Sequence, residues 1–328
     1  MAQGILRWGL VGTARINRAV IPPLRHSPRN TLVAVASRTA ERAATYAREW
    51  QIPRAFGSYE SLLADPDIDV VYNPLPNSLH AEWTIAALRA GKHVLCEKPL
   101  TLSVEDVDAI ATAARQADRV VTEAFMYRHH PQTLEVKRLL DEGAIGSLRL
   151  VRGAFTFTVR QTTNVRLDPA LGGGSLWDVG CYPVSWARVM AGTEPIEVFG
   201  WARVGPSGVD ETFVGQMRFP DGILAQFDSG LASPWRTHVE MVGSEGSIAV
   251  ARPFKPLPRG EIVLTRGETV ETLETAEQEL YLGEIEDMAD AVLDGRAPRI
   301  PLSDSRHNVA AVLALLRSAA EGRPVLLP

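Results

Sequence analysis

Two patterns of apolar and polar positions divide the chain, and the change between them falls near Gly146. In the first stretch, short apolar runs alternate with segments whose apolar residues recur every three or four positions. Short runs predict buried strands and the longer spacing predicts helices, so their alternation indicates a doubly wound parallel sheet. Strands are expected at 6–11, 32–36, 70–72, 93–96 and 120–121, and helices at 81–88 and 104–114.

After Gly146 the dominant pattern is strict alternation, as in the sequence around Phe155, Phe157 and Val159. This pattern predicts half-buried strands at 148–159, 196–204, 212–219, 223–229, 238–242 and 262–265. Turn residues at 220–222 and 243–246 predict hairpins and hence a mostly antiparallel sheet. One face of such a sheet is expected to stay free of helices and to be buried in a homodimer or homotetramer. Two late apolar stripes, at 285–293 and 309–316, predict structural helices.

The expected fold class is therefore α/β plus α+β. A dinucleotide-binding Rossmann domain is expected at 1–125, followed by a substrate-binding and oligomerisation domain at 126–328 with an open, mostly antiparallel sheet. A length of 328 residues suits two domains, and 45% hydrophobic with 22% charged residues is typical of a soluble globular protein. A net charge of -5 gives no sign of a nucleic-acid or membrane partner.

Targeting and metal signals are not apparent in the sequence. We see no secretory leader pattern and no apolar run of roughly 20 residues, so a cytoplasmic protein is expected. Cys96 and Cys181 lack the spacing of a zinc site or a redox dithiol, and the adjacent His129 and His130 lack ligand spacing. No metal is expected.

A candidate phosphate-binding turn follows the first predicted strand. Gly12, Thr13, Ala14, Arg15 and Ile16 stand where a dinucleotide fold needs a tight turn, with a helix after it whose amide groups meet the pyrophosphate. Ala14 takes the second glycine position of the usual fingerprint and Asn17 the third, so the fingerprint is degenerate.

The end of the second predicted strand indicates which dinucleotide is bound. NAD enzymes usually carry Asp or Glu there to hold the ribose diol. This chain instead carries Ser37 and Arg38, with Arg42 one helical turn further on. A hydroxyl and guanidinium groups suit a 2′-phosphate, so NADP is expected and NAD remains possible.

Two further segments are expected at the strand tips, where open parallel sheets bind ligands. The first is the extended segment after the fourth strand, in which Leu75, Asn77 and His80 are candidates for cofactor contact and Asn77 or Ser78 for the helix cap. The second is the Glu97-Lys98 pair, which ends the fifth strand and is followed by a proline that stops the ladder.

In order and spacing, these segments resemble the glucose–fructose oxidoreductase, inositol dehydrogenase and rhizopine-catabolism (MocA) family over essentially the whole chain. The resemblance rests on 12–16, 74–80 and 91–99 and on the Gly-rich segment at 172–183. Tyr182 stands where the inositol dehydrogenases carry His. With a tyrosine here, the chain resembles the aldose (xylose-type) and dihydrodiol dehydrogenase branch. Two residues depart from the family pattern. Asn73 stands where an apolar residue is usual, and Ser185 stands where Asp is frequent.

The resemblance implies hydride exchange between NAD(P) and a hydroxyl or carbonyl carbon of a sugar-like substrate. It implies that Lys98, Asp178 and Tyr182 are catalytic and that Arg166 contacts the cofactor. On a helix, Asp178 and Tyr182 would share one face. We expect Tyr182 to exchange the hydroxyl proton while Lys98 stabilises the alkoxide, although the reverse division of these roles stays open.

Three functions fit these residues. An NADP-dependent dehydrogenase acting on an aldose such as xylose or glucose is preferred. A dihydrodiol or inositol-type dehydrogenase, or a non-catalytic NADP-sensing regulator, is the alternative. Polar and aromatic residues are candidates for substrate binding, namely Tyr127, Arg128, Arg160, Asn164, Trp177, Trp235 and His238.

Overall fold

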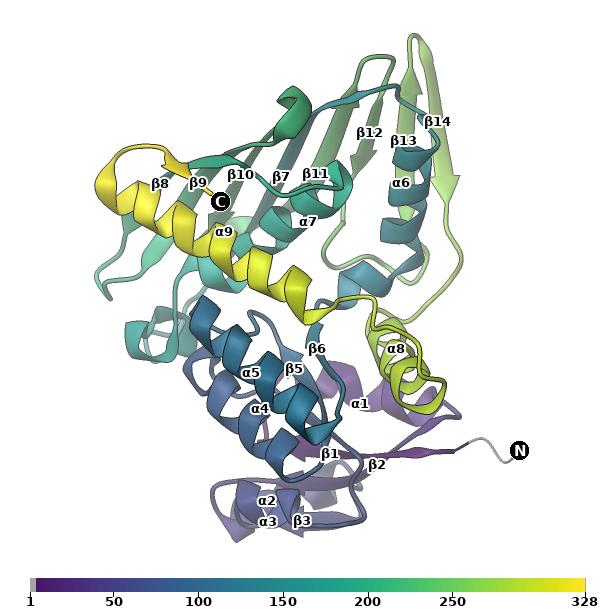
Figure 1. Ribbon diagram of the computed structural model, residues 1–328, viewed down its shortest axis with the longest axis vertical. Helices are drawn as coiled ribbons and strands as arrows, with labels where there is room; N and C mark the ends of the chain where they lie inside the picture. The colour runs from purple at the N-terminus through teal and green to yellow at the C-terminus, as the bar shows by residue number, and fades with distance from the viewer. Residues whose placement is uncertain (1–3, 328) are drawn as a thin grey trace. The chain divides into compact units, whose positions relative to one another are not determined.

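The computed structural model describes residues 4–327, which form two compact units (Figure 1). The first unit comprises the chain up to residue 126 together with 281–306. The second comprises 127–280 and the chain from 307 onward. Residues 281–306, expected in the second domain, therefore belong to the first unit. In the described part of the chain, no helix is long and apolar enough to cross a membrane.

A six-stranded parallel sheet forms the centre of the first unit, as the sequence predicted. Its order is β3-β2-β1-β4-β5-β6, so the direction of winding reverses between β1 and β4, where such sheets bind dinucleotides. All four residues of β4 and of β6 are buried, as expected for strands covered on both faces. The strands are β1 Leu6–Val11, β2 Asn30–Ala36, β3 Arg54–Phe56, β4 Val70–Asn73, β5 His93–Glu97 and β6 Val121–Ala124.

Helices connect these strands, and α1 packs with α8 while α4 packs with α5. Ser103 caps α5 as its position suggested, since its Oγ accepts from the Asp106 amide at 3.1 Å. The expected cap of α4 was wrong, because Asn77 and Ser78 lie in a separate 3₁₀ turn. The elements are α1 Asn17–His26, α2 Ala40–Glu49, α3 Tyr59–Leu63, η1 Asn77–Leu79, α4 His80–Arg89, α5 Val104–Ala117 and α8 Leu282–Leu293.

The second unit contains a nine-stranded sheet in the order β14-β13-β12-β11-β7-β10-β9-β8-β15. Its pairs are antiparallel except for β7 with β10, and the two predicted turns join β9 to β10 and β11 to β12. The strands are β7 Leu148–Thr158, β8 Glu197–Val204, β9 Asp210–Arg218, β10 Leu224–Gly230, β11 Ala232–Gly243, β12 Ser247–Val250, β13 Glu261–Arg266, β14 Thr269–Glu274 and β15 Val325–Leu326.

Helices α6, α7 and α9 lie on one face of this sheet (Figure 1). Side chains that point toward them, such as Phe155, Phe213 and Met241, are buried and form the core. The helices and short turns are η2 Met126–His129, α6 Pro131–Asp141, η3 Val165–Leu167, η4 Pro169–Leu171, η5 Leu176–Gly180, α7 Cys181–Ala191, η6 Pro220–Gly222 and α9 Leu302–Glu321.

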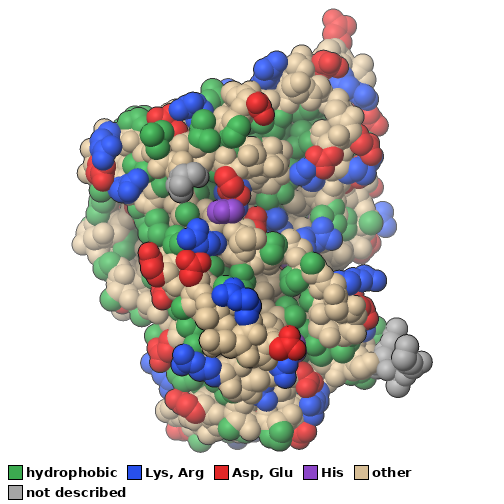
Figure 2. Space-filling model, in the orientation of Figure 1, with side chains coloured by type: hydrophobic (Ala, Val, Ile, Leu, Met, Phe, Trp, Pro, Cys, Tyr) green, Lys and Arg blue, Asp and Glu red, His purple; other side chains and the backbone are tan. Residues whose placement is uncertain are grey.

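The opposite face of the nine-stranded sheet is a mixture of apolar and charged side chains. Trp201, Val214 and Leu224 are exposed there by 56%, 41% and 49%. Elsewhere on this face, cross-strand ion pairs join Arg152 to Glu240 and Arg236 to Asp228. Seen from the direction of Figure 2, acidic and basic side chains are likewise intermixed over the surface, in keeping with the small net charge.

Candidate active site

The turn after β1 has the geometry of an anion-binding site. Gly12 adopts φ +104°, and a Cβ there would lie 3.1 Å from the Leu75 side chain. Both the backbone conformation and the limited space therefore favour glycine. Among the described residues, no backbone carbonyl accepts from the amides of 13–16. These amides precede the N-terminus of α1, where the helix dipole favours negative charge. The turn therefore has donors suited to a pyrophosphate.

Asn17 explains the degenerate fingerprint, and the sequence analysis did not assign it a role. Its side chain is fully buried, and its Nδ2 donates to the Gly12 carbonyl at 3.0 Å. A glycine in the third position normally gives close helix–strand packing. Here the asparagine holds the turn from inside, so the turn keeps its shape without the third glycine.

Basic side chains gather beside this turn. The Arg42 Nε donates to Thr13 Oγ1 at 2.8 Å, and Thr39 caps α2 by accepting from the Arg42 amide at 3.3 Å. Burial raises the pKa of Tyr59, while the nearby charges of Arg38 and Arg42 act in the opposite direction. The structure thus brings together Arg38, Arg42 and Thr13, three of the predicted cofactor residues.

Two aromatic residues line the same region and were not predicted. The Tyr59 hydroxyl lies 3.8 Å from where a Gly12 Cβ would be. Its ring meets the Trp83 ring edge to face, at 4.8 Å between centroids. Ser37, by contrast, is buried, and its amide donates to the Phe56 carbonyl. Tyr59 and Trp83 belong to separate helices, so no local sequence signal joined them to the turn.

Carboxylates hold the tip of β5, where Lys98 follows the strand. The Tyr72 hydroxyl donates to Glu97 Oε1 at 2.5 Å, and the Lys98 amide donates to Glu97 Oε2 at 3.3 Å. Burial raises the pKa of Tyr72 well above its usual value, and the Glu97 charge adds to the shift, so the phenol stays a donor. Glu123 at the tip of β6 accepts from the Leu100 amide at 2.8 Å. Both carboxylates fix the backbone on either side of the Lys98–Pro99 peptide.

His80 is placed differently from expectation. Its side chain is fully buried, with Nδ1 2.8 Å from the Pro99 carbonyl and Nε2 2.7 Å from the Leu75 carbonyl. Two carbonyl partners favour a protonated ring, but burial is the larger effect and lowers the pKa of His80 to about 4. Direct cofactor contact through its ring nitrogens is therefore wrong. His80 instead holds together the backbone after β4 and after β5.

Asn73, one of the two departures from the family pattern, supports the same backbone. Its Nδ2 donates to the His80 carbonyl and to Thr84 Oγ1, both at 3.2 Å. Its Oδ1 accepts from the Leu75 amide at 3.4 Å. The polar residue at the end of β4 is thus satisfied internally, and it fixes the loop that carries Leu75.

In the second unit, Asp178 lies in η5, a single π-helical turn that leads into α7. The sequence predicted a regular α-helix here, and the wider π turn means that Asp178 and Tyr182 are not exactly one helical turn apart. Asp178 Oδ2 accepts from Arg166 Nε at 2.6 Å, and the Arg166 guanidinium also lies over the Phe157 ring, 5.7 Å from its centroid. The Asp178 side chain is 12% exposed and that of Arg166 40%. The pair is thus open to a ligand from one side.

Tyr182, in the first turn of α7, is packed among aromatic rings. Its ring centroid lies 5.3 Å from that of Phe155, 5.5 Å from Phe254 and 5.7 Å from Tyr127. These residues come from β7, from the proline-rich segment before β13 and from η2. Rings on three sides leave the Tyr182 side chain 3% exposed and fix the direction of its phenol.

Ser185, the second departure, lies one turn further along α7. Its Oγ accepts from the Tyr127 hydroxyl at 2.9 Å and from Arg128 at 3.1 Å. Tyr127 and Arg128 were candidates for substrate binding, but both are buried and bonded to this serine. Through their bonds to Ser185 on α7, they support the aromatic cluster around Tyr182.

The remaining substrate candidates separate by face of the sheet. Trp235 is half exposed, and its ring meets the Phe155 ring at 5.4 Å, on the same face as Tyr182. His238 pairs with Ala154 and lies on the helix-free face, so its candidacy was wrong. The Asn164 side chain accepts from the Arg166 amide at 3.1 Å and thereby orients that arginine.

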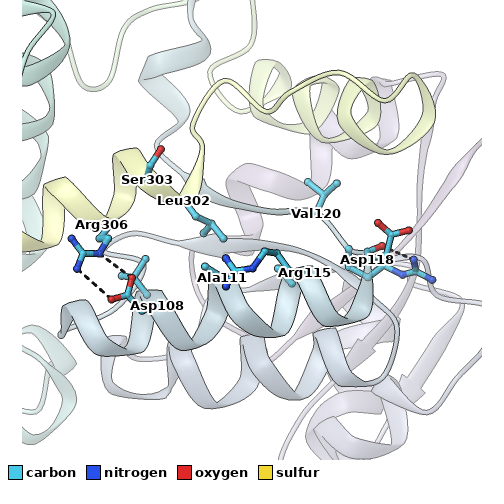
Figure 3. Close-up of a pocket in the computed structure, with 11 residues that line it drawn as sticks. Asp108, Ala111, Arg115, Asp118, Val120, Leu302, Ser303 and Arg306 are labelled. Carbon is cyan, nitrogen blue, oxygen red and sulfur yellow. Dashed lines mark hydrogen bonds and ion pairs between the residues drawn. The ribbon is translucent and has the colours of Figure 1, made fainter.

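An open groove of about 560 Å³ runs beside α5 (Figure 3), but it contains none of the predicted site residues. Its walls come from α5, the turn before β6 and the first residues of α9. Arg306 and Asp108 form an ion pair across one end of it. The groove lies toward the amino end of β6, whereas ligands of such sheets bind at the carboxyl ends. Among the described residues, no group of His, Cys, Asp and Glu side chains could hold a metal ion.

Comparison with known proteins covers the whole chain. Residues 6–125 match the model of an oxidoreductase family with an NAD-binding Rossmann fold. Residues 133–249 match the model of the GFO/IDH/MocA C-terminal domain. The chain is 36% identical over 327 residues to a D-xylose 1-dehydrogenase (NADP(+)) from Haloferax volcanii, covering 98% of this chain and 100% of that one.

Two solved structures are similar along nearly their full length. One is an aldose-aldose oxidoreductase from Caulobacter crescentus complexed with glycerol, with a TM-score of 0.92, 29% identity and coverage of 98% and 100%. The other is a 3-ketoreductase from Actinomadura kijaniata with NADP and TDP-benzene, with a TM-score of 0.91, 32% identity and coverage of 96% and 98%. Further structures of that ketoreductase carry a tyrosine-to-phenylalanine or a lysine-to-alanine substitution. The chain therefore belongs to the GFO/IDH/MocA family of oxidoreductases.

Proposed function

We propose that this oxidoreductase uses NADP to transfer a hydride between nicotinamide and a hydroxyl or carbonyl carbon of a sugar, with an aldose such as xylose or glucose as substrate. The observation that carries the proposal is the pair Lys98 and Tyr182. The lysine and tyrosine substituted in the related ketoreductase have the same separation in its sequence as these two residues. The full-length similarity to a xylose dehydrogenase supports the substrate class.

The cofactor residues of the first unit fit a 2′-phosphorylated dinucleotide. The amides of 13–16 would bind the pyrophosphate, with Leu75 and Asn77 along the next loop. Arg38 and Arg42, with Ser37 and Thr13, would hold the 2′-phosphate through charge-assisted hydrogen bonds. NAD lacks that group and would lose these contacts, and no acidic side chain stands at this position in the sequence to hold its free ribose diol.

Nicotinamide, when bound, supplies the two-electron acceptor or donor for the substrate carbon. In the oxidative direction, the hydrogen on the substrate carbon leaves with its electron pair as hydride, while the O–H proton passes to the protein. We assign that proton to the oxygen of Tyr182, which must be in its phenolate form to accept it and becomes a neutral phenol, while hydrogen bonding by the Lys98 ammonium stabilises the developing alkoxide. The reverse division, with Lys98 exchanging the proton, makes the same chemical balance and is the second arm of the tests below.

Asp178 and Arg166 would act on the substrate side of the reaction. Their 2.6 Å ion pair holds the carboxylate in one orientation, in which it would accept a hydrogen bond from a sugar hydroxyl. Arg166 is the only one of the predicted cofactor residues that lies in the second unit.

The test is NADPH formation by the purified protein. Protein with NADP or NAD is mixed with a panel of aldoses, cyclic polyols and dihydrodiols, and absorbance of the reduced cofactor is followed. Turnover with an aldose and NADP is expected. Turnover confined to dihydrodiols or inositols would show that the proposed aldose substrate is wrong. Tight NADP binding without turnover on any compound would favour a regulator.

We also propose that the helix-free face of the nine-stranded sheet binds a second copy of the chain. Exposed Trp201, Val214 and Leu224 lie beside cross-strand pairs of opposite charge. A two-fold axis would bring each patch onto its own copy, so one face can be complementary to itself. Sedimentation should show a dimer or tetramer that Trp201→Glu dissociates. A wild-type monomer at micromolar concentration would contradict this.

A further inference from the structure

Glu284 is a fully buried carboxyl group in the first turn of α8. Neither of its oxygens has a hydrogen-bond partner among the described residues. An ionised carboxylate in such a place lacks both water and donors, which is one of the most costly arrangements in a protein. The group has no part in the proposed function, so its presence needs another explanation.

The charges that surround Glu284 are of its own sign. Glu97 at the tip of β5 and Asp287 on α8 both disfavour its ionisation. The phenols of Tyr72 and Tyr281 border the same space, and burial together with Glu97 and Glu284 raises the pKa of each. Both phenols therefore stay neutral and add no positive charge.

The cations near α8 are engaged elsewhere on that helix. Arg29 pairs with Asp290 at 2.5 Å and with Asp294 at 2.7 Å. Arg296 also pairs with Asp290, at 3.0 Å, and the charge of Arg299 acts on Asp287. Burial is the largest cause of the raised pKa of Glu284, and the like charge of Glu97 is the next.

Glu97 is the point at which this cluster meets the proposed chemistry. Its two oxygens accept from the Tyr72 hydroxyl and from the Lys98 amide, which suits the ionised form. Glu97 and Glu284 therefore differ in the number of donors around them, although the charge of Glu97 acts on Glu284. Two neighbouring carboxyls of this kind divide the proton unequally.

We propose that Glu284 is a positioning residue that stays protonated beside Glu97, so that the cluster behind Lys98 carries a single negative charge. This assignment rests on the proposed role of Lys98. While Glu284 is neutral, the Glu97 carboxylate remains bonded to Tyr72 and to the Lys98 amide. When Glu284 loses its proton, the second negative charge repels Glu97 and disturbs the turn that carries Lys98.

The protonation state is tested directly by infrared spectroscopy of the full-length protein. At neutral pH, the infrared difference spectrum of wild type minus Glu284→Gln should show the carbonyl stretch of a protonated carboxylic acid. Asp287→Asn is the matched control, because that carboxylate lies one turn further along α8 and accepts from the Arg299 amide. The band should survive in the control. The proposal is overturned if the band persists in both variants. It is also overturned if the band is lost in Asp287→Asn but kept in Glu284→Gln.

The second measurement is stability against pH. Because the folded pKa of Glu284 is raised, the stability due to its bound proton is complete below the ordinary value of about 4.3 and is lost as pH rises toward the folded pKa. Over that window the unfolding equilibrium constant of wild type should increase relative to Glu284→Gln by about tenfold per pH unit. Parallel curves would contradict a protonated Glu284. If the variant does not fold, persistence of the acid band in wild type above neutral pH replaces this comparison.

The third measurement separates this inference from the proposed function. The alkaline limb of kcat/KM should move to higher pH in Glu284→Gln, with kcat at neutral pH unchanged within about twofold. If the acid band is present but the limb does not move, Glu284 holds its proton without positioning Lys98. If no sugar is turned over at all, the first two measurements still decide the protonation state, and the pH dependence of NADP affinity takes the place of kcat/KM.

Discussion

The two units hold their candidate site residues by different means. In the first unit, backbone amides, strand ends and short-range hydrogen bonds form the site, as at Gly12 and Glu97. In the second, Tyr182 is positioned by rings that arrive from β7, η2 and the segment before β13. A site built from local turns tolerates change at a single side chain poorly but can be identified from sequence. A site built from distant rings shows no local signal.

The same contrast extends to the sheets. The parallel sheet is buried on both faces, so its chemistry is confined to its edges. The mixed sheet has helices on one face only, and its other face is left for charged pairs and exposed apolar side chains. The first unit is therefore specialised at its strand tips, whereas the second offers two separate surfaces.

The largest effect is expected from Lys98→Ala. Removing the ammonium should lower kcat by about 10²- to 10⁴-fold, because stabilisation of the alkoxide is lost, with a smaller change in NADP affinity. Steady-state kinetics and a fluorescence titration with NADP measure the two effects. Arg115→Ala, in the groove beside α5, is the control and should keep wild-type kcat. A Lys98→Ala enzyme within tenfold of wild type would break the assignment of chemistry to the first unit.

Tyr182→Phe tests the contribution of the second unit. The substitution keeps the ring in the aromatic cluster and removes only the hydroxyl, so kcat should fall about 100-fold or more while stability and NADP affinity stay unchanged. Kinetics, thermal unfolding and cofactor titration are measured on the same sample. Near wild-type kcat would transfer the proton-exchange role to Lys98.

His80 should make the first unit sensitive to acid. Its pKa is lowered to about 4, so the unfolded chain binds more protons below the ordinary value of about 6.5. The stability due to the neutral ring is complete above that value and is lost as pH falls toward 4. Between pH 7 and pH 5, wild type should lose about 2 kcal/mol more than His80→Gln in urea unfolding. His93, whose pKa is likewise lowered to about 4, remains in both proteins as an internal control.

Arg42→Ala should have the smallest effect and sharpen cofactor choice. Loss of one charge-assisted hydrogen bond should weaken NADP binding roughly 10-fold and leave NAD binding unchanged. The ratio of the two dissociation constants is measured by titration. Arg48→Ala, on the same helix, should leave that ratio as in wild type. Equal weakening of both cofactors would place Arg42 outside the 2′-phosphate site.

Most of the fold could be predicted from periodicity. The strand at 93–96 and the hairpin around 220–222 follow from patterns a few residues long, and the structure confirms both. Neither β3 nor β14 was predicted, because β3 has only three residues and β14 is largely exposed and polar. The return of 281–306 to the first unit is a tertiary event that no local pattern encodes.

From residue patterns alone, the candidate site was predictable only where a local turn determines it, whereas Asp178 and Tyr182 were expected from the family resemblance. Gly12 and Lys98 stand at strand ends that the sequence marks, whereas Tyr59 and Trp83 meet only in the folded unit. His80 was misassigned because its first-turn position suggested accessibility, while the carbonyls of Leu75 and Pro99 enclose it. The π turn at Asp178 was missed because apolar spacing does not distinguish a single π turn from a turn of α-helix.

The placement of α8 has a consequence for how this protein is made. Arg29 bonds to Asp290 and Asp294, and the Ile300 carbonyl accepts from Thr122, so the nucleotide-binding unit takes its last pieces from beyond β14 in the chain. A ribosome must synthesise strands β7 to β14 of the nine-stranded sheet before those pieces emerge. Evolution therefore cannot exchange this cofactor module by a single crossover at residue 126, since the transplanted half would arrive without its closing helix.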